Sequence, residues 1–171
     1  MLESSEIYFQ HLKLFSGAVL MSPLIQPDSS ISNPINHLLL KIFSNIYPDF
    51  ESPQGVDLSQ VTSDPYWLKV RSNDPLCYYG GYLAGHGQVL NTEINKLRGR
   101  YQDFTTPFLM MITNRDRLAD PQASKTFFVT TRSKDKELHY FNEGLHNLFI
   151  EKEDIRRRAI SLTVEWIENR L

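Results

Sequence analysis

Runs of apolar residues between polar loops predict buried β-strands in this chain. Residues 16–23 (SGAVLMSP) form a nearly unbroken apolar run that ends in proline. Residues 106–114 (TPFLMMITN) repeat the pattern, with Pro107 at the start of the strand, where proline is tolerated. Strands that are apolar on both sides are typical of parallel sheets. Residues 138–141 are more mixed, as expected of a strand nearer the sheet edge, so the pattern predicts about three parallel strands.

Capping residues and periodicity predict two helices in the last third of the chain. Asp120 followed by Pro121 is a favourable start, because the aspartate caps free N–H groups and proline loses no hydrogen bond there. A final helix is expected over about residues 153–169, where one face is apolar. The residues on that face are Ile155, Ala159, Leu162 and Trp166. Strands that alternate with helices between residues 106 and 170 predict an α/β fold.

Residues 27–105 differ from the parts of the chain that flank them. Six prolines interrupt this segment, and helical patterns are more frequent in it than strand patterns. Within it, residues 35–46 place apolar side chains on one helical face. Those side chains are Ile35, Leu38, Leu39, Ile42, Phe43 and Ile46. We therefore expect three parts: residues 1–26 with a helix and a strand, a mainly helical insertion at 27–105, and an α/β part at 106–171.

Polar residues that follow the predicted strands are the candidates for catalysis, because loops at the carboxyl ends of strands carry the functional side chains of open α/β sheets. Asp116 follows the strand at 106–114, and His146 comes thirty residues later, after the strand at 138–141. An acid followed by a histidine is the order of the α/β-hydrolase triad. In that triad the carboxylate orients the imidazole and stabilises its charged form. Taken alone, each residue has a structural alternative, as a turn former or as a hydrogen-bonded histidine.

Composition narrows the classes of function. Eighteen basic and twenty acidic side chains give a net charge of −2, and no basic stripe suggests a nucleic-acid partner. Cys77 is the single cysteine of the sequence, which excludes an internal disulfide and a zinc cluster. It is interpreted as a small buried hydrophobe, or else as a thiol near a binding pocket. An acidic N-terminus and the absence of a long apolar run predict a cytoplasmic protein without a membrane span, and no cofactor is expected.

Several segments together resemble the monoacylglycerol lipases and related serine hydrolases of the α/β-hydrolase fold, and the resemblance covers most of the chain. They are residues 15–24 (FSGAVLMSPL), 73–76 (NDPL), 106–109 (TPFL) and 116–118 (DRL). The resemblance implies that Asp116 is the triad acid and His146 the general base. It also implies that residues 27–105 form a cap over an acyl-binding site, with a lipid or acyl ester as substrate.

The nucleophile of this family has no counterpart in the sequence, since no G-x-S-x-G segment occurs in it. In the family that segment lies about twenty residues before the strand matched by residues 16–23. The resemblance therefore places it just upstream of Met1, with residues 1–14 in the helix that follows it. On this interpretation the chain is the C-terminal part of a hydrolase and is inactive alone. Two alternatives stay open: a non-catalytic module that binds acyl chains or a partner, and a truncated product without function.

Other candidate residues are expected to have structural roles. Residues 85–87 (GHG) resemble an oxyanion motif, but they lie within the insertion and out of order. Ser4 and Ser5 lack the flanking glycines that a strained nucleophile turn needs. The remaining histidines have no partners at metal-ligand spacing. They are His11, His37 and His139.

The apolar helix at residues 35–46 has two interpretations. It packs within the cap, or it admits a lipid substrate and rests on a membrane surface. Lys41 is its one basic residue, so attraction to anionic lipids is not expected. Peripheral membrane contact through this helix therefore stays an open expectation.

Overall fold

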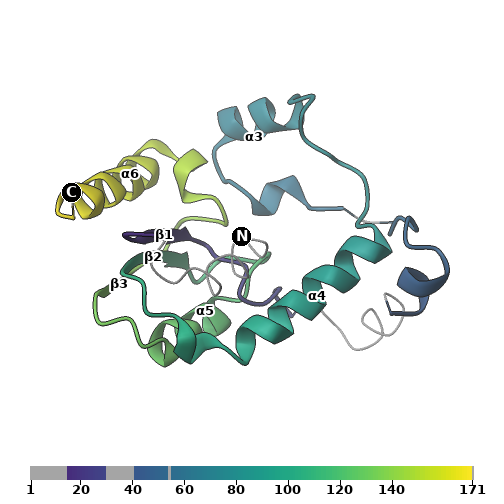
Figure 1. Cartoon of the computed structure of the whole chain (residues 1–171). Helices are drawn as coiled ribbons and strands as arrows, with labels where there is room; N and C mark the ends of the chain where they lie inside the picture. The colour runs from purple at the N-terminus through teal and green to yellow at the C-terminus, as the bar shows by residue number, and fades with distance from the viewer. Residues whose placement is uncertain (1–14, 30–40, 54, 171) are drawn as a thin grey trace.

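A parallel three-stranded sheet forms the centre of the fold (Figure 1). The computed structural model describes residues 15–29, 41–53 and 55–170. The strands are β1 (Ala18–Met21), β2 (Phe108–Thr113) and β3 (Lys136–Phe141). β2 lies in the middle and pairs in parallel with both neighbours. The structure thus confirms the predicted α/β fold with three parallel strands.

The six residues of β2 are all buried, because alternate side chains of a strand point to opposite faces and both faces of this sheet are covered. Phe108, Met110 and Ile112 face a layer formed by α4 (Ala84–Arg98) and α5 (Pro121–Thr130). Leu109 and Met111 of β2 face α6 (Glu153–Glu168). Figure 1 shows α6 on one side of the sheet and α5 on the other.

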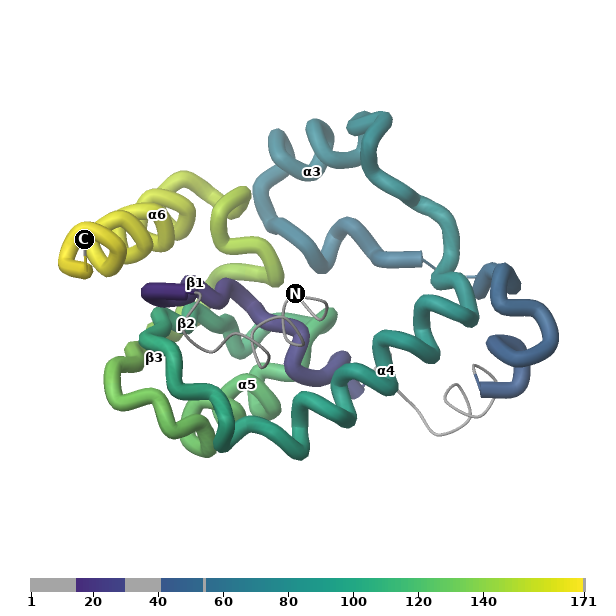
Figure 2. Tube along the Cα trace, in the orientation of Figure 1, coloured from purple at the N-terminus to yellow at the C-terminus, as the bar shows by residue number. Residues whose placement is uncertain are grey.

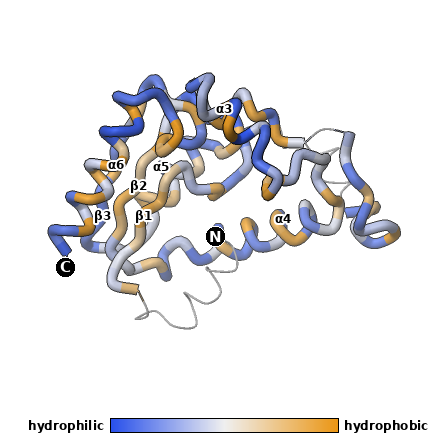
Figure 3. Tube along the Cα trace, turned by 90° about the horizontal axis from the view of Figure 1, so that it is seen from above, coloured by the Kyte–Doolittle hydropathy of each residue, from blue (hydrophilic) through white to orange (hydrophobic). Residues whose placement is uncertain are grey.

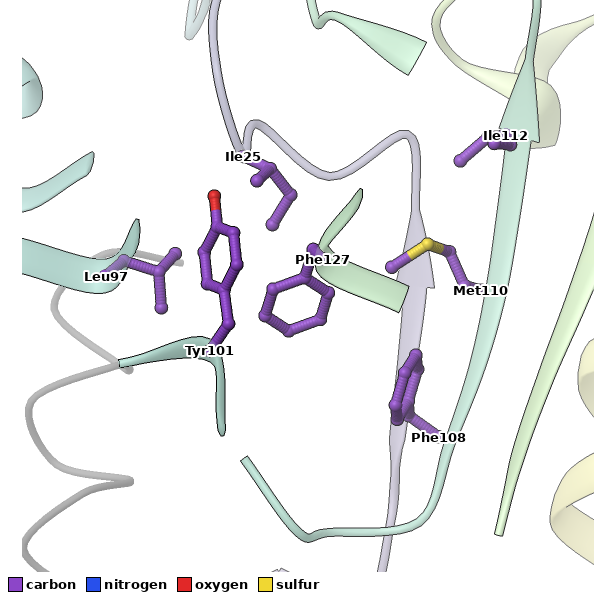
Figure 4. Packing of buried hydrophobic residues seen from close by; sticks show 7 residues of the cluster. All are labelled: Ile25, Leu97, Tyr101, Phe108, Met110, Ile112 and Phe127. Carbon is purple, nitrogen blue, oxygen red and sulfur yellow. The ribbon is translucent and has the colours of Figure 1, made fainter. Parts of the chain in front are cut away.

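Aromatic residues fill the layer between the sheet and α4 and α5 (Figure 4). The ring of Phe127 on α5 contacts Tyr101 edge-on, with ring centres 5.1 Å apart. Such edge-on pairs are favourable because the positive edge of one ring meets the negative face of the other. Burial raises the pKa of the Tyr101 phenol, an effect that Arg98 partly offsets. The phenol is therefore uncharged in this cluster at neutral pH.

The two predicted helices of the last third are confirmed. Asp120 caps α5 by accepting a hydrogen bond from the backbone N–H of Gln122, and Pro121 is the first helical residue. α6 buries Ile155, Ala159 and Trp166 against the sheet, as its apolar stripe predicts, whereas Leu162 is half-buried. Both helices therefore form where local signals and an apolar face agree.

Most of the regular structure described between residues 41 and 105 is helical. Its long helices are α3 (Pro65–Ser72) and α4, and short 3-10 helices cover Leu58–Gln60 and Tyr101–Asp103. α4 alternates between hydrophobic and hydrophilic residues along its length (Figure 3), so one side of it packs and the other is exposed. Residues 41–46 are helical, and residues 35–40 of the predicted helix lie outside the described part. No helix in the described ranges has the length and apolar character needed to cross a membrane.

The segment around α3 stands away from the sheet, next to the start of α6 (Figure 2). Arg156, near the start of α6, contacts this segment at two residues. The guanidinium of Arg156 on α6 lies 5.8 Å from the ring centre of Trp67 on α3. It also lies 4.0 Å from the carboxylate of Asp64, which caps α3. Residues 64–67 therefore lie beside the first turn of α6.

Candidate active site

Asp116 lies in the loop that follows β2, residues 114–120, which we call the acid loop. Its side chain is buried. One carboxylate oxygen, Oδ1, accepts hydrogen bonds from the backbone N–H groups of Leu118 and Ala119, at 2.8 and 3.0 Å. The other oxygen, Oδ2, lies 2.9 Å from Nδ1 of His146. The loop therefore holds the carboxylate with one oxygen and directs the other at the imidazole.

The chain segment that follows β1 binds the acid loop through two backbone hydrogen bonds. The backbone N–H of Asp28 donates to the carbonyl of Leu118 at 3.1 Å. The backbone N–H of Asp120 donates to the carbonyl of Gln26 at 2.8 Å. These two hydrogen bonds hold Leu118 and Asp120 of the acid loop, and α5 begins directly after Asp120. The position of the acid loop thus depends on residues far away in the sequence.

His146 lies in the loop between β3 and the next helical turn, residues 142–147, which we call the histidine loop. The buried hydroxyl of Thr113, at the end of β2, donates to the carbonyl of Gly144 at 2.5 Å. A β-carbon on Gly144 would lie 2.5 Å from a methyl group of Leu148, so glycine lets the loop pack closely. The neighbouring strand end thus supports the histidine loop directly.

The backbone of the histidine loop also binds residues 60–64 of the insertion, which we call the cap seam. The N–H of His146 donates to the carbonyl of Gln60 at 3.3 Å, and the N–H of Asn147 donates to that of Val61 at 2.8 Å. The imidazole itself is 28% exposed, whereas Asp116 is 4% exposed. The pair therefore has a buried acid and a base that reaches solvent.

This arrangement suits proton transfer. With a proton on Nδ1, the imidazole of His146 donates to Asp116, and its second nitrogen, Nε2, is left as a proton acceptor. A carboxylate in this position stabilises the imidazolium that forms when Nε2 takes a proton. The pair can thus act as a general base, provided that a group with an acidic proton lies next to Nε2.

Two other candidates from the sequence have local structural surroundings. Residues 85–87 lie in the first turns of α4, where the N–H of Gly87 bonds the carbonyl of Leu83 and His86 is exposed. The thiol of Cys77 is half-buried, and its sulfur lies 3.6 Å from the Asp74 carboxylate. Cys77 is therefore not the fully buried hydrophobe that composition suggests.

Of the remaining histidine and serine candidates, the structure describes His139. His139 lies on β3, with its Nε2 3.5 Å from the carboxylate of Glu137. The candidates outside the described residues are Ser4, Ser5, His11 and His37. Within the described ranges, no group of three or more His, Cys, Asp or Glu side chains is placed to hold a metal ion.

Two residues that support the pair are not apparent from the sequence. Thr113 looks like an ordinary strand residue, and Glu151 is one of several acidic residues near the start of the last helix. Both are fully buried, and both hydrogen-bond the histidine loop. A single sequence carries no signal for them, because their partners are backbone groups that the fold brings close.

Comparison with known proteins identifies a family whose model matches most of this chain. The family described as serine aminopeptidase, S33, matches residues 5–153. A monoglyceride lipase of Mus musculus is 24% identical over 157 residues, which are 92% of this chain and 52% of the relative. This chain thus spans about half the length of that curated relative.

Two solved structures share the fold. A soluble variant of the monoglyceride lipase of Saccharomyces cerevisiae, in complex with a substrate analog, has a TM-score of 0.82 at 20% identity. It is matched over 96% of this chain and 60% of its own length. The monoacylglycerol lipase of Paleococcus ferrophilus has a TM-score of 0.86 at 19% identity, over 99% of this chain and 65% of its own.

Proposed function

Because this chain belongs to the serine aminopeptidase S33 family of α/β-hydrolases, we propose that it carries the acid and the general base of a monoacylglycerol lipase-like ester hydrolase. Asp116 is the proposed acid, and His146 the proposed base. The observation that carries this proposal is the 2.9 Å contact between Asp116 Oδ2 and His146 Nδ1. Both residues lie in loops at the carboxyl ends of parallel strands, where catalytic residues of such sheets lie.

The proposed reaction is acyl transfer through a serine. Nε2 of His146 takes the proton of a serine hydroxyl while the serine oxygen attacks the ester carbonyl, and Asp116 stabilises the resulting imidazolium. The imidazolium then gives the proton to the leaving alcohol, which leaves an acyl-serine. Water, activated by the same imidazole, releases the acid and restores the serine. Each half-reaction, acylation and then deacylation, returns His146 to its neutral form.

The serine of this proposal lies outside the 171 residues, because they contain no G-x-S-x-G segment. We propose that the 171-residue chain does not hydrolyse esters by itself. A fluorophosphonate probe, which reacts with activated serines, tests this directly. It should label a version extended upstream to include a G-x-S-x-G segment, and it should leave the 171-residue chain unlabelled. Labelling of the 171-residue chain at any of its serines contradicts the proposal.

A lipid ester is the proposed substrate. Support comes from relatives named monoglyceride lipase and from a related structure described as a complex with a substrate analog. We further propose that the predicted helix at residues 35–46 contacts a lipid surface. In its described part, Ile42 and Ile46 are exposed, which leaves apolar area available.

Binding to vesicles tests the proposed lipid contact. Ile46→Ser should weaken binding to uncharged phosphatidylcholine vesicles, measured by co-sedimentation, by about fivefold, the effect expected from losing roughly 1 kcal/mol of apolar transfer free energy. Val129→Ser is the matched control, because Val129 is similarly exposed but lies on α5. Equal binding of both variants and the wild type contradicts a membrane role for this helix.

A further inference from the structure

Glu151 is a fully buried carboxylate beside the histidine loop. Its oxygen Oε1 accepts hydrogen bonds from the backbone N–H groups of Leu145 and Ser63, each at 2.9 Å. Oε2 accepts from the hydroxyl of Ser63 at 2.6 Å and from the N–H of Lys152 at 3.2 Å. An ionised carboxylate has about four acceptor positions, so these four donors use its full capacity.

The donors belong to two parts of the chain that are distant in sequence. Leu145 directly precedes His146 in the histidine loop, and Ser63 belongs to the cap seam. A carboxylate bound by both holds the two segments at a fixed separation. Charge-assisted hydrogen bonds of this kind are roughly twice as strong as neutral ones.

Other contacts join the cap seam to the histidine loop and to the helical turn that follows it. The hydroxyl of Thr62 donates to the carbonyl of Ile150 at 2.6 Å. The cap seam also accepts the backbone N–H groups of His146 and Asn147. Among these contacts, the side chain of Glu151 binds both segments: Oε1 accepts from Leu145 and Ser63, and Oε2 accepts a further hydrogen bond from Ser63.

We propose that Glu151 is a positioning residue for the acid and histidine pair. By binding Leu145 and Ser63 together, it holds the imidazole of His146 on Asp116 and makes that position depend on the cap seam. This inference rests on the proposed function, in which His146 is the base. A catalytic ring held through such outer contacts loses its alignment when they are removed.

The hydrogen-bonded ring proton of His146 reports this role without any need for catalysis. In the 171-residue chain, a proton on Nδ1 shared with Asp116 should give a resolved downfield NMR signal that Asp116→Asn abolishes. In Glu151→Gln, an NH₂ group replaces one carboxylate oxygen, and this group cannot accept hydrogen bonds from the donors that face it. We expect it to broaden this signal and to speed hydrogen exchange of the Leu145 amide about tenfold, the effect of losing one charged hydrogen bond.

Two controls separate positioning from stability. Glu143→Gln changes an exposed carboxylate on the same loop and should leave both readings unchanged. Met110→Ala removes a buried side chain from the sheet and lowers stability without touching the histidine loop, so it should keep the ring proton signal. If Met110→Ala loses the signal as Glu151→Gln does, Glu151 has no specific positioning role.

The outcomes also separate this inference from the proposed function. A folded Glu151→Gln variant with a wild-type ring signal overturns the role of Glu151 and leaves the acid and histidine pair intact. If the wild-type chain shows no ring proton bonded to Asp116, the acid and histidine pair does not form, and both proposals are contradicted. If Glu151→Gln does not fold, Ser63→Ala removes one of the four donors. Hydrogen exchange of the Leu145 amide must then be faster in Ser63→Ala than in Glu143→Gln. Equal exchange rates in these two variants contradict the inference.

Discussion

At the scale of single residues, the acid and the base are supported by different kinds of contact. Asp116 is held by N–H groups of its own loop, whereas His146 depends on groups from β2, the cap seam and Glu151. The Asp116 carboxylate is therefore oriented within its own loop, which backbone hydrogen bonds to Gln26 and Asp28 hold in place, whereas the loop of His146 is held by β2, the cap seam and Glu151.

Loss of the acid should affect catalysis more than folding. In a version of the protein that contains the nucleophile, we predict that Asp116→Asn lowers kcat for a short-chain nitrophenyl ester by roughly 10³-fold to 10⁴-fold. The amide keeps the size of the side chain but leaves the imidazole in the wrong tautomer. Steady-state hydrolysis measures this. A decrease below tenfold contradicts the assignment of Asp116 as the triad acid.

The hydroxyl of Thr113 should contribute to stability through the histidine loop. Thr113→Val keeps the shape of the side chain but leaves the carbonyl of Gly144 and the N–H of Arg115 without this partner. We expect the free energy of unfolding in urea to fall by about 1–3 kcal/mol. Thr113→Ser retains the hydroxyl and should lose less. Equal losses in both variants would show that packing, not the hydrogen bonds, is the contribution.

The sequence predicted residues at the site only where chain order carries information. Asp116 and His146 follow two strands in the order of a known triad, and this order is visible without coordinates. Thr113 and Glu151 contribute through contacts with backbone groups, so no spacing identifies them. Their roles become visible only when the histidine loop is placed against β2 and the cap seam.

At the scale of elements, α6 covers one face of the sheet with a small residue at its centre. Ala159 is fully buried, and its neighbour Ile160 is exposed. We predict that Ala159→Leu lowers the free energy of unfolding by about 1–3 kcal/mol, because the added atoms have no space. Ile160→Leu is the matched control and should change it by less than about 0.5 kcal/mol. Thermal unfolding that shows equal stability for both variants contradicts the packing of α6 on the sheet.

An ion pair joins the end of α6 to the turn before β3. Arg170 donates to both oxygens of Asp135, at 2.6 and 3.0 Å, and these hydrogen bonds hold the pKa of Asp135 below its ordinary value. Because the folded pKa is the lower one, the pair stabilises the fold above about pH 4 and loses this effect as pH falls through the folded pKa. The effect is small, since both groups are at the surface.

Melting temperatures test this pH dependence. Asp135→Asn should melt below the wild type at pH 7, and the difference should shrink at pH 2, where Asp135 is protonated in both states. Glu143→Gln serves as the control with an exposed carboxylate elsewhere. A difference that stays constant between the two pH values contradicts the contribution of the ion pair.

The elements that the sequence predicted well are those with strong local signals. β2 is an unbroken apolar run, and α5 begins at an aspartate followed by proline. β3 is longer than predicted, beginning at Lys136, because its first residues alternate in burial and look like a polar turn. Pairing with β2 extends the strand, and such pairing is set by tertiary structure and not by local pattern.

At the scale of the whole molecule, the described residues form one part of a larger family fold. In the described sheet, β1 and β3 each pair with a single neighbour, so both are edge strands. Unpaired strand edges favour association with other chains. The match over about half the length of a curated relative agrees with a sheet of few strands. The proposed catalysis accordingly needs more than the groups described.

The central claim is that His146 is the general base of a serine ester hydrolase. The most direct measurement compares wild type and His146→Ala in a version that includes a G-x-S-x-G segment, with ester hydrolysis and fluorophosphonate labelling as the readouts. We predict that His146→Ala folds as the wild type does but loses labelling, with kcat lowered by roughly 10⁴-fold or more. Labelling and hydrolysis at wild-type rates in His146→Ala would contradict the account.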